Sequence, residues 1–366
     1  MKKNFLGALV LTLFFVFSSP ASAFGPRLEV DEHLWIQLGF LGQVQYETVE
    51  DAAGTDNDEW SNEFFFRRAR ILAVGSVHEK VKFFFDTDVP NAGKTGADNS
   101  LIWNDGIIDL QFMPEINLSM GRILPPFSIE SQASATTLLG IDYNLNSIKL
   151  PTPNDRSFWR DDGIEARGIL ANGLIDYRLG VFRGQRDDTL NPDDDLRTTG
   201  MVMINLADSQ PGWFYNTNSL GALDTLSFGV GFDRIPNSGS GFDNAKAWSL
   251  FALLDKGLGM GRLTAAAAYY DYDGDGWAGG FEGNTASAQV GYLLSCMLVE
   301  NAHWQPVLRW QHQDPDDGSK LDTVNLGLNY YLRGHHINFK ADYAINDRRI
   351  DGDRVDAFRI QTQIYF

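Results

Sequence analysis

Most of the chain alternates apolar and polar residues with a period of two. Between Leu34 and Tyr46 the even positions are mostly apolar, whereas Gln37, Gln43 and Gln45 occupy odd positions. The last segment repeats the pattern, with an apolar face made of Phe358, Ile360, Ile364 and Phe366. Because successive side chains of a strand point to opposite faces, this period predicts strands with one apolar and one polar face.

Sixteen such segments can be placed along the chain. Besides the first and the last, they cover residues 61–78, 79–89, 103–113, 115–123, 162–171, 173–183, 198–207, 222–234, 244–255, 261–271, 283–295, 302–313, 320–332 and 335–346. Tight turns at 113–115, 171–173 and 333–334 alternate with long polar loops at 49–60, 124–161, 184–197 and 272–282. The connection 208–221 is the one exception, because it is long although its place in the order predicts a tight turn. An even number of strands with short turns at one end and long loops at the other is typical of outer-membrane β-barrels.

A soluble β-sandwich or a secreted β-propeller would also alternate, so the residues on the two faces decide between the folds. One set of faces is apolar and aromatic, as at Phe83 and Phe85 or at Phe228 and Val230. The opposite faces carry many charges, which a soluble core could not accommodate but a wet barrel interior can. The pattern therefore predicts an all-β fold, a transmembrane antiparallel β-barrel of about 16 strands.

The first 23 residues have a different character from the rest. Lys2 and Lys3 precede an apolar run from Phe5 to Phe17, and a small-residue segment ends at Ala23. This order is typical of a secretory signal peptide. After it, no apolar stretch approaches 18 residues, which excludes helical membrane spans. We expect cleavage near Ala23, a single barrel domain over residues 24–366, and a place in the outer membrane of a Gram-negative bacterium.

Composition narrows the possible functions further. The chain has 366 residues with 30 Lys+Arg against 48 Asp+Glu, a net charge of −18, and this balance argues against a nucleic-acid partner. The single cysteine, Cys296, allows no internal disulfide, and no Cys/His cluster has the spacing for structural zinc or attached haem. No G-x-S-x-G, H-E-x-x-H or phosphate-binding glycine loop is present, so the sequence does not predict an enzyme.

The polar faces supply candidate pore-lining residues of both signs. The basic ones are Arg68, Arg70, Lys80, Lys82, Arg167, Arg178, Arg309, Lys340 and Arg359. The acidic ones are Asp86, Asp88, Asp109, Glu165, Asp176, Asp233 and Asp342. Loops 49–60, 271–282 and 313–319 hold twelve further acids and no Lys or Arg. This mixed, mildly basic wall predicts weak anion preference at best, with cation preference as the alternative. Arg68 and Arg70 could equally form a wall-stabilising network with Asp86 and Asp88.

The longest connection, residues 124–161, is a candidate constriction loop. Its middle, residues 136–141, is apolar, and a long loop that is not uniformly hydrophilic is usually packed against something. Inside a barrel the available surface is the inner wall, although an outer rim or a subunit contact would also serve. The candidate constriction residues are Pro125, Pro126, Phe127, Glu130, Lys149 and Arg156.

Three stretches resemble a known family. They are residues 63–71 (EFFFRRARI), residues 82–86 (KFFFD) and residues 117–130 (NLSMGRILPPFSIE), with further agreement at 161–164 and 172–173. Together they are similar to the phosphate-selective porin O and P family, specifically over residues 60–185. The resemblance implies a sixteen-stranded trimeric diffusion channel whose third long loop folds into the lumen. Family members named for phosphate rely on lysines and arginines in the pore, and the acidity of this chain departs from that pattern.

One loop matches a calcium-binding pattern, D-x-[DN]-x-[DN]-G-x₅-E. Asp271, Asp273 and Asp275 stand at alternate positions, and Glu282 occupies the twelfth. In an EF-hand these residues surround one Ca²⁺ with oxygen ligands between two helices, whereas strands flank the loop here. The alternatives are a weak Ca²⁺ site, with affinity of roughly 10⁻⁴ to 10⁻³ M, or a solvated acidic loop. No other cofactor is expected.

Together, these features predict an outer-membrane porin with a permanently open, water-filled channel for small hydrophilic solutes or ions. The expected partners are membrane lipid, lipopolysaccharide and two further copies of the chain. The alternatives are a cation-preferring porin and a structural barrel that docks or sheathes a periplasmic partner, such as a redox protein.

Overall fold

The computed structural model describes residues 25–151, 158–185, 191, 193–237, 244–274, 276–294 and 302–366. The predicted signal peptide lies outside these residues. The long strands are β2 (Trp35–Val49), β3 (Glu63–His78), β4 (Val81–Asp88), β5 (Ile102–Met113), β6 (Ile116–Ile123), β7 (Asp161–Leu170), β8 (Ile175–Phe182), β9 (Arg197–Asn205), β10 (Thr225–Ile235), β11 (Ala245–Leu258), β12 (Gly261–Asp273), β13 (Gly283–Leu293), β14 (His303–Pro315), β15 (Leu321–Arg333), β16 (Ile337–Ile350) and β17 (Asp353–Tyr365). A short strand, β1 (Arg27–Glu29), pairs with the start of β2, and a 3-10 turn, η1 (Ala171–Gly173), follows β7.

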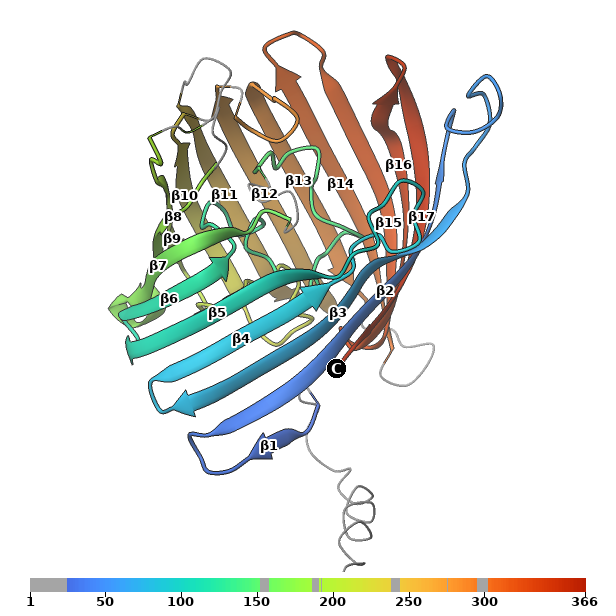
Figure 1. Cartoon of the computed structure of the whole chain (residues 1–366). Coiled ribbons are helices and arrows are strands. Elements are labelled where there is room, and N and C mark those ends of the chain that lie inside the picture. Colours follow the sequence, from blue (N-terminus) through green and yellow to red (C-terminus); the bar gives the residue numbers. More distant parts are fainter. Residues whose placement is uncertain are drawn as a thin grey trace, which may run out of the picture.

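These sixteen long strands close into one barrel. Each strand from β2 to β16 pairs antiparallel with the next one in the chain, and β17 returns to pair with β2 (Figure 1). A closed ring leaves no unpaired edge strand, which is how barrels avoid edge-to-edge aggregation. The predicted sixteen-stranded antiparallel barrel is thus confirmed. Among the described residues, no helix is long and apolar enough to cross a membrane.

The two ends of the barrel differ, as the sequence predicted. At the short-turn end, most connections span a few residues, such as 79–80 and 114–115. At the long-loop end, the connections include 50–62, 89–101 and 124–160. The last hairpin extends further than its pattern indicated, because a register shift after Ala344 interrupts the alternation in β16. Asp351 and Gly352 close this hairpin with positive φ values of 50° and 95°, the conformation that two-residue hairpin turns require.

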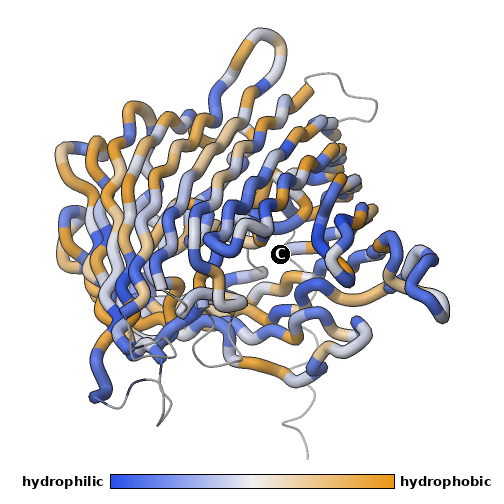
Figure 2. Tube along the Cα trace, turned by 90° about the horizontal axis from the view of Figure 1, so that it is seen from above, coloured by the Kyte–Doolittle hydropathy of each residue, from blue (hydrophilic) through white to orange (hydrophobic). Residues whose placement is uncertain are grey.

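The barrel is inverted relative to a soluble protein, with apolar side chains outside and polar ones inside. Along β15, Leu326 and Leu328 are 54% and 44% exposed, whereas Asn325 and Asn329 are both 2% exposed. In a closed barrel, the buried set can only face the interior. Figure 2 shows apolar and polar residues alternating along the strands. This inversion distinguishes a membrane barrel from a soluble sandwich.

Strands β2–β5 depart from the inversion, because part of their inner face is apolar. Leu41, Leu72, Phe84 and Ile107 are buried there and belong to one cluster with loop residues such as Leu138. The apolar middle of the connection 124–160 therefore packs against an apolar patch of the inner wall. In Figure 1 this segment, drawn in teal to green, lies within the ring of strands.

The loop enters the barrel through a close contact with β10. Thr199 and Ser249 donate hydrogen bonds to the carbonyl oxygens of Pro126 and Phe127. A Cβ atom at Gly231 would overlap the carbonyl oxygen of Phe127, so glycine is needed for the backbone to approach this closely.

We expect Gly231→Val to push the start of the loop away from the wall. Overpacking of this kind costs about 1–3 kcal/mol, so the variant should denature at a lower temperature than the wild type in detergent. Gly257→Val is the matched control, since no atom lies within 4 Å of a Cβ at that position. Equal denaturation temperatures for the two variants would contradict the close contact.

Candidate functional site

A β-bulge in β3 turns two neighbouring arginines toward the interior. The pairing of β2 with β3 shifts register between Gln43 and Val44, so Arg67 has no partner residue on β2. Such a bulge breaks the strict alternation of side chains. Arg68 is 2% exposed, and the side chain of Arg67 is 13% exposed. The sequence prediction included Arg68 among the pore-lining residues but not Arg67.

Both guanidinium groups bind the carboxylate of Asp142 in the loop. Arg67 Nε donates to Oδ2 at 2.5 Å, and Arg68 Nη2 donates to Oδ1 at 2.8 Å. Burial alone raises the pKa of the Asp142 carboxyl, but the two guanidinium groups hold that pKa well below its usual range. Asp142 therefore stays ionised and neutralises part of the arginine charge.

A polar layer crosses from the wall to the loop at this level. Arg68 Nη1 donates to Gln43 Oε1 at 2.7 Å, and Gln43 Nε2 donates to Gln363 Oε1 at 2.7 Å. Gln43 Nε2 also donates to the carbonyl oxygen of Ala135 in the loop, at 3.1 Å. We call Gln43, Arg68, Gln363 and Asp142 the constriction layer.

Wall side chains on β14, β15 and β16, the strands that precede β17 in the ring, hold the backbone of the loop. The donors are Lys340 Nζ to the carbonyls of Leu138 (2.5 Å) and Gly140 (2.8 Å), Asn329 Nδ2 to Leu139 (2.8 Å) and Arg309 Nη1 to Asp142 (2.8 Å). Two of these donors, Lys340 and Arg309, are basic residues that the sequence predicted on the inner wall. In the structure they face carbonyl oxygens of the loop.

Arg70 forms the wall network that the sequence offered as an alternative. Its side chain contacts Asp88 at 2.8 Å and Asp86 at 3.3 Å across β3 and β4. Next to it, Arg160 binds Asp105 at 2.8 Å. Arg68 does not join this network, because its partner is the loop carboxylate.

Most of the other predicted wall residues are also paired. Arg167 binds Asp109 at 3.0 Å, and Arg359 binds both Glu47 and Asp347 at 2.6 Å. The following are buried: Arg178, Glu165, Asp176, Asp233 and Asp342. Lys82 is half-buried near the short-turn end. The expectation for Lys80 was wrong, since it is exposed in the turn between β3 and β4, where the alternation of the strand has ended.

The predicted loop residues divide into buried and outer groups. Pro125, Pro126 and Phe127 are buried, and burial raises the pKa of the Glu130 carboxyl, which accepts hydrogen bonds from Asn144. Lys149 is half-buried and lines a cavity of about 500 Å³ near the long-loop end. Arg156 lies outside the described residues.

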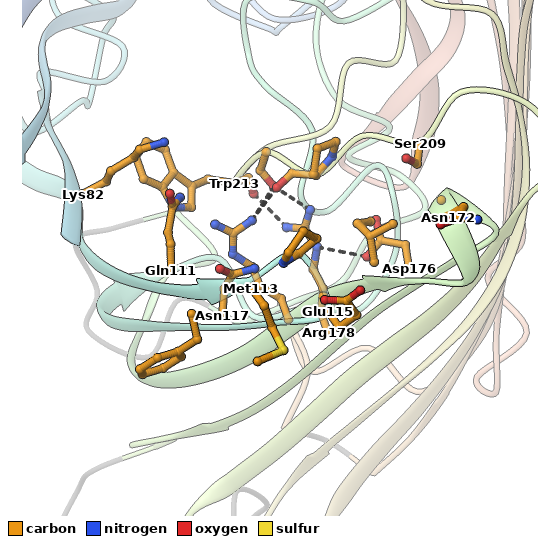
Figure 3. Close-up of a pocket in the computed structure, with 18 of the residues that line it drawn as sticks. Lys82, Gln111, Met113, Glu115, Asn117, Asn172, Asp176, Arg178, Ser209 and Trp213 are labelled. Atoms are coloured by element: carbon orange, nitrogen blue, oxygen red, sulfur yellow. Dashed lines mark hydrogen bonds and ion pairs between the residues drawn. The ribbon is translucent and has the colours of Figure 1, made fainter. Parts of the chain in front are cut away.

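Three cavities follow one another along β2–β4. Of these three, the cavity nearest the long loops has about 330 Å³ and is lined by Glu47 and Arg67, among others. A central cavity of about 150 Å³ touches Leu41 and Arg70. The third, of about 930 Å³, opens at the short-turn end near Lys82 (Figure 3). Gln43 and Arg68 stand between the first two along the strands, so the constriction layer separates them.

The cavity nearest the long loops, which we call the outer cavity, is the most basic of the three. Its cations are Arg67, Lys94, Arg309, Arg348 and Arg359, and its anions are Glu47, Asp142 and Asp347. Five positive against three negative groups give a net charge of +2. Sequence reasoning missed Arg67 because of the bulge, Arg348 because of the register shift in β16, and Lys94 because it lies in a loop.

The predicted calcium loop does not begin as the pattern assumed. Asp271 and Asp273 belong to strand β12 and are exposed, and Glu282 accepts a hydrogen bond from the backbone of Gly274. Asp275 lies outside the described residues. Within the described ranges, no three His, Cys, Asp or Glu side chains form a group that could hold a metal ion. Calcium binding stays a prediction.

Part of the chain matches a known protein family. Residues 39–209 match the model of the family described as phosphate-selective porin O and P. An uncharacterized protein of Aquifex aeolicus (strain VF5) is 23% identical over 285 residues, which cover 70% of this chain and 66% of that protein, just under two thirds of its length.

Two solved porins show the same fold at low identity. Salmonella typhi OmpF, in complex with daunomycin, aligns with a TM-score of 0.63 and 11% identity, covering 93% of this chain and 100% of that one. An anion-selective porin from Comamonas acidovorans aligns with a TM-score of 0.56 and 12% identity, covering 90% and 99%. These likenesses concern the fold. The chain is therefore a porin-fold protein that carries, over residues 39–209, the sequence signature of the phosphate-selective porin O and P family.

Proposed function

We propose that the protein is a passive channel for small hydrophilic solutes, with a weak preference for anions. The observation that carries this proposal is the outer cavity, where five cations face three anions directly above the constriction layer. Rings of basic side chains favour anions, and interleaved acids weaken that field within a Debye length of about 8 Å at physiological salt. The preference is therefore modest, in contrast to a pore lined by lysine and arginine alone.

The same proposal places the protein in the outer membrane of a Gram-negative bacterium, after cleavage near Ala23. Its support is the apolar outer face of the barrel, together with the order of charge and apolar residues at the N-terminus. Short turns then face the periplasm and long loops face the outside. A homotrimer embedded in lipid and lipopolysaccharide is the assembly that the family resemblance implies.

Bilayer recording tests the channel directly. The mature protein, folded in detergent and added to a planar bilayer, should give discrete current steps in potassium chloride. A folded protein that gives no current above the bare bilayer would exclude the channel. Recovery of a stoichiometric haem protein with the barrel from native membranes would instead favour the alternative role of docking a periplasmic redox partner.

The selectivity should depend on pH through Lys149. Burial lowers the pKa of its ammonium group to about 8, and Nζ donates to Gln313 Oε1 at 3.1 Å. Because the neutral form is favoured above that pH, most of one positive charge is lost as the pH rises from 7 to 9. At a distance of one Debye length, we expect the anion-to-cation permeability ratio to fall about twofold.

Zero-current potentials of two variants isolate this effect. Lys149→Met should show no step of this size over the same pH range, and Lys149→Arg should keep the higher ratio at pH 9. Because all other titrating groups are common to the three proteins, an equal pH response in all of them would remove Lys149 from the account.

A further inference from the structure

The connection between β9 and β10, residues 206–224, enters the barrel from the short-turn end. A connection on this side normally spans only a few residues, yet this one has a buried centre. Tyr215 is 0% exposed, and Thr217 and Asn218 are 2% and 1% exposed. Such burial within a connection requires partners for its backbone groups, and the barrel interior supplies them.

Two arginines of the wall bind the first half of the connection. Arg167 of β7 donates to the carbonyl oxygens of Pro211 and Gly212, at 2.7 and 3.0 Å. Arg178 of β8 donates to Gly212 and Trp213, both at 2.8 Å. Figure 3 shows Arg178 and Trp213 among the side chains that line the cavity at the short-turn end. Both arginines were predicted to line the pore, and in the structure they hold this connection.

The second half reaches the opposite wall. Asn218 Nδ2 donates to Gln305 Oε1 of β14 at 3.0 Å and to the hydroxyl of Tyr331 of β15 at 2.8 Å. The carbonyl oxygen of Asn218 contacts Nε2 of His335 at 2.8 Å. Strands β8 and β15 are seven positions apart in a ring of sixteen, which places them nearly opposite each other. The connection thus crosses the interior.

The connection also pairs with the constriction loop. Tyr215 forms a parallel β-bridge with Ala133, in which its nitrogen donates to Gln132 and its carbonyl oxygen accepts from Ser134. The connection also contacts the wall at β4, where the ring centroids of Trp213 and Phe214 lie 5.7 and 5.4 Å from that of Phe84.

The space between these rings and the wall is small. Trp213 and Phe214, together with Arg70 and Asp105, line the central cavity of about 150 Å³. At roughly 30 Å³ for each water molecule in the liquid, this cavity holds about five waters. Trp213 also lines the large cavity at the short-turn end, so its ring stands between the two spaces.

We propose that residues 209–219 form a second constriction in series with the loop, and that Trp213 and Phe214 set the size limit of the channel. This inference rests on the proposed channel function. It assigns small inorganic ions as the permeating class and excludes solutes of the size of a sugar, because the central cavity has room for a few waters only.

The test is Trp213→Ala with Phe214→Ala, a change that leaves intact the backbone carbonyls bound by Arg167 and Arg178. Removal of two rings widens the path, so we expect conductance in potassium chloride to rise about twofold. The variant should also admit sugars, measured by swelling of proteoliposomes in raffinose or glucose. Trp248→Ala is the matched control, since this tryptophan is 63% exposed on the outer face. The single change Phe214→Ala is a milder variant and should give intermediate values.

The outcomes separate the two proposals. In one outcome, the wild type conducts, and the folded double and single variants show the same conductance and the same sugar exclusion as the wild type. That result overturns the second constriction and leaves the channel function intact. Current from the variants alone, with a silent wild type, overturns the open channel and leaves residues 209–219 as a closed plug. The absence of current from every folded protein overturns the channel function and the second constriction with it.

Discussion

Replacement of Asp142 by asparagine should raise the anion-to-cation permeability ratio about fivefold. A unit charge about 8 Å from the path acts on an ion with about 0.5 kcal/mol in water, with opposite sign for anions and cations. Salt screens a largely buried charge such as Asp142 much less than a charge in open solution, so the unscreened value applies to it. Asp142 is the carboxylate that neutralises both Arg67 and Arg68. Its loss changes the net charge around the outer cavity from +2 to +3. Asparagine keeps the shape and one acceptor oxygen, so the loop can remain in place.

The control for this prediction is Asp56→Asn in the long loop 50–62. Asp56 is exposed, and the substitution makes the same change in net charge away from the wall. Zero-current potentials across a potassium chloride gradient measure both variants. A larger effect at Asp56 than at Asp142 would mean that the acidic loops, and not the constriction layer, govern permeation. Arg67→Gln should shift the ratio in the opposite direction from Asp142→Asn.

Lys340→Met should loosen the constriction loop and lower the stability of the barrel by about 3 kcal/mol or more, since each hydrogen bond from a charged donor contributes about 1.5–3 kcal/mol. The Nζ group of Lys340 donates hydrogen bonds to the carbonyl oxygens of Leu138 and Gly140. Methionine has a side chain of similar size but no hydrogen-bond donor. Two buried carbonyl oxygens then lack this partner, which favours loop conformations that expose them to water. We expect higher open-channel noise and larger conductance.

Lys256→Met is the control for this change. It replaces lysine by methionine at an exposed position outside the barrel interior. Thermal denaturation in detergent and single-channel recording give the two readouts. If Lys340→Met matches the wild type in both, the hydrogen bonds from Lys340 do not hold the loop.

The alternation of residues was sufficient to predict the barrel, its strand order and the faces of most strands. Leu326 and Asn325 show why, since a period of two survives wherever a strand is regular. Prediction failed where the backbone departs from that period. The bulge at Arg67 turns an apparently outward arginine inward, and no local feature of the segment 63–71 marks it.

The function of the wall arginines was less predictable than their position. Arg167 and Arg178 were recognised as inward-facing, but both also bind backbone carbonyls of a connection more than thirty residues away. Such contacts depend on tertiary structure that a single sequence does not display. The signal that was present lay in the connection itself, where Trp213, Phe214 and Tyr215 follow one another on the side of the barrel expected to have short polar turns.

The zero-current potential of the wild-type channel in a tenfold gradient of potassium chloride tests the account most directly. The basic outer cavity predicts a potential with the sign of chloride preference, and a magnitude well below that of an ideally selective membrane. A potential with the sign of potassium preference would contradict the account, because the field of the acidic loops would then outweigh that of Arg67 and its neighbours.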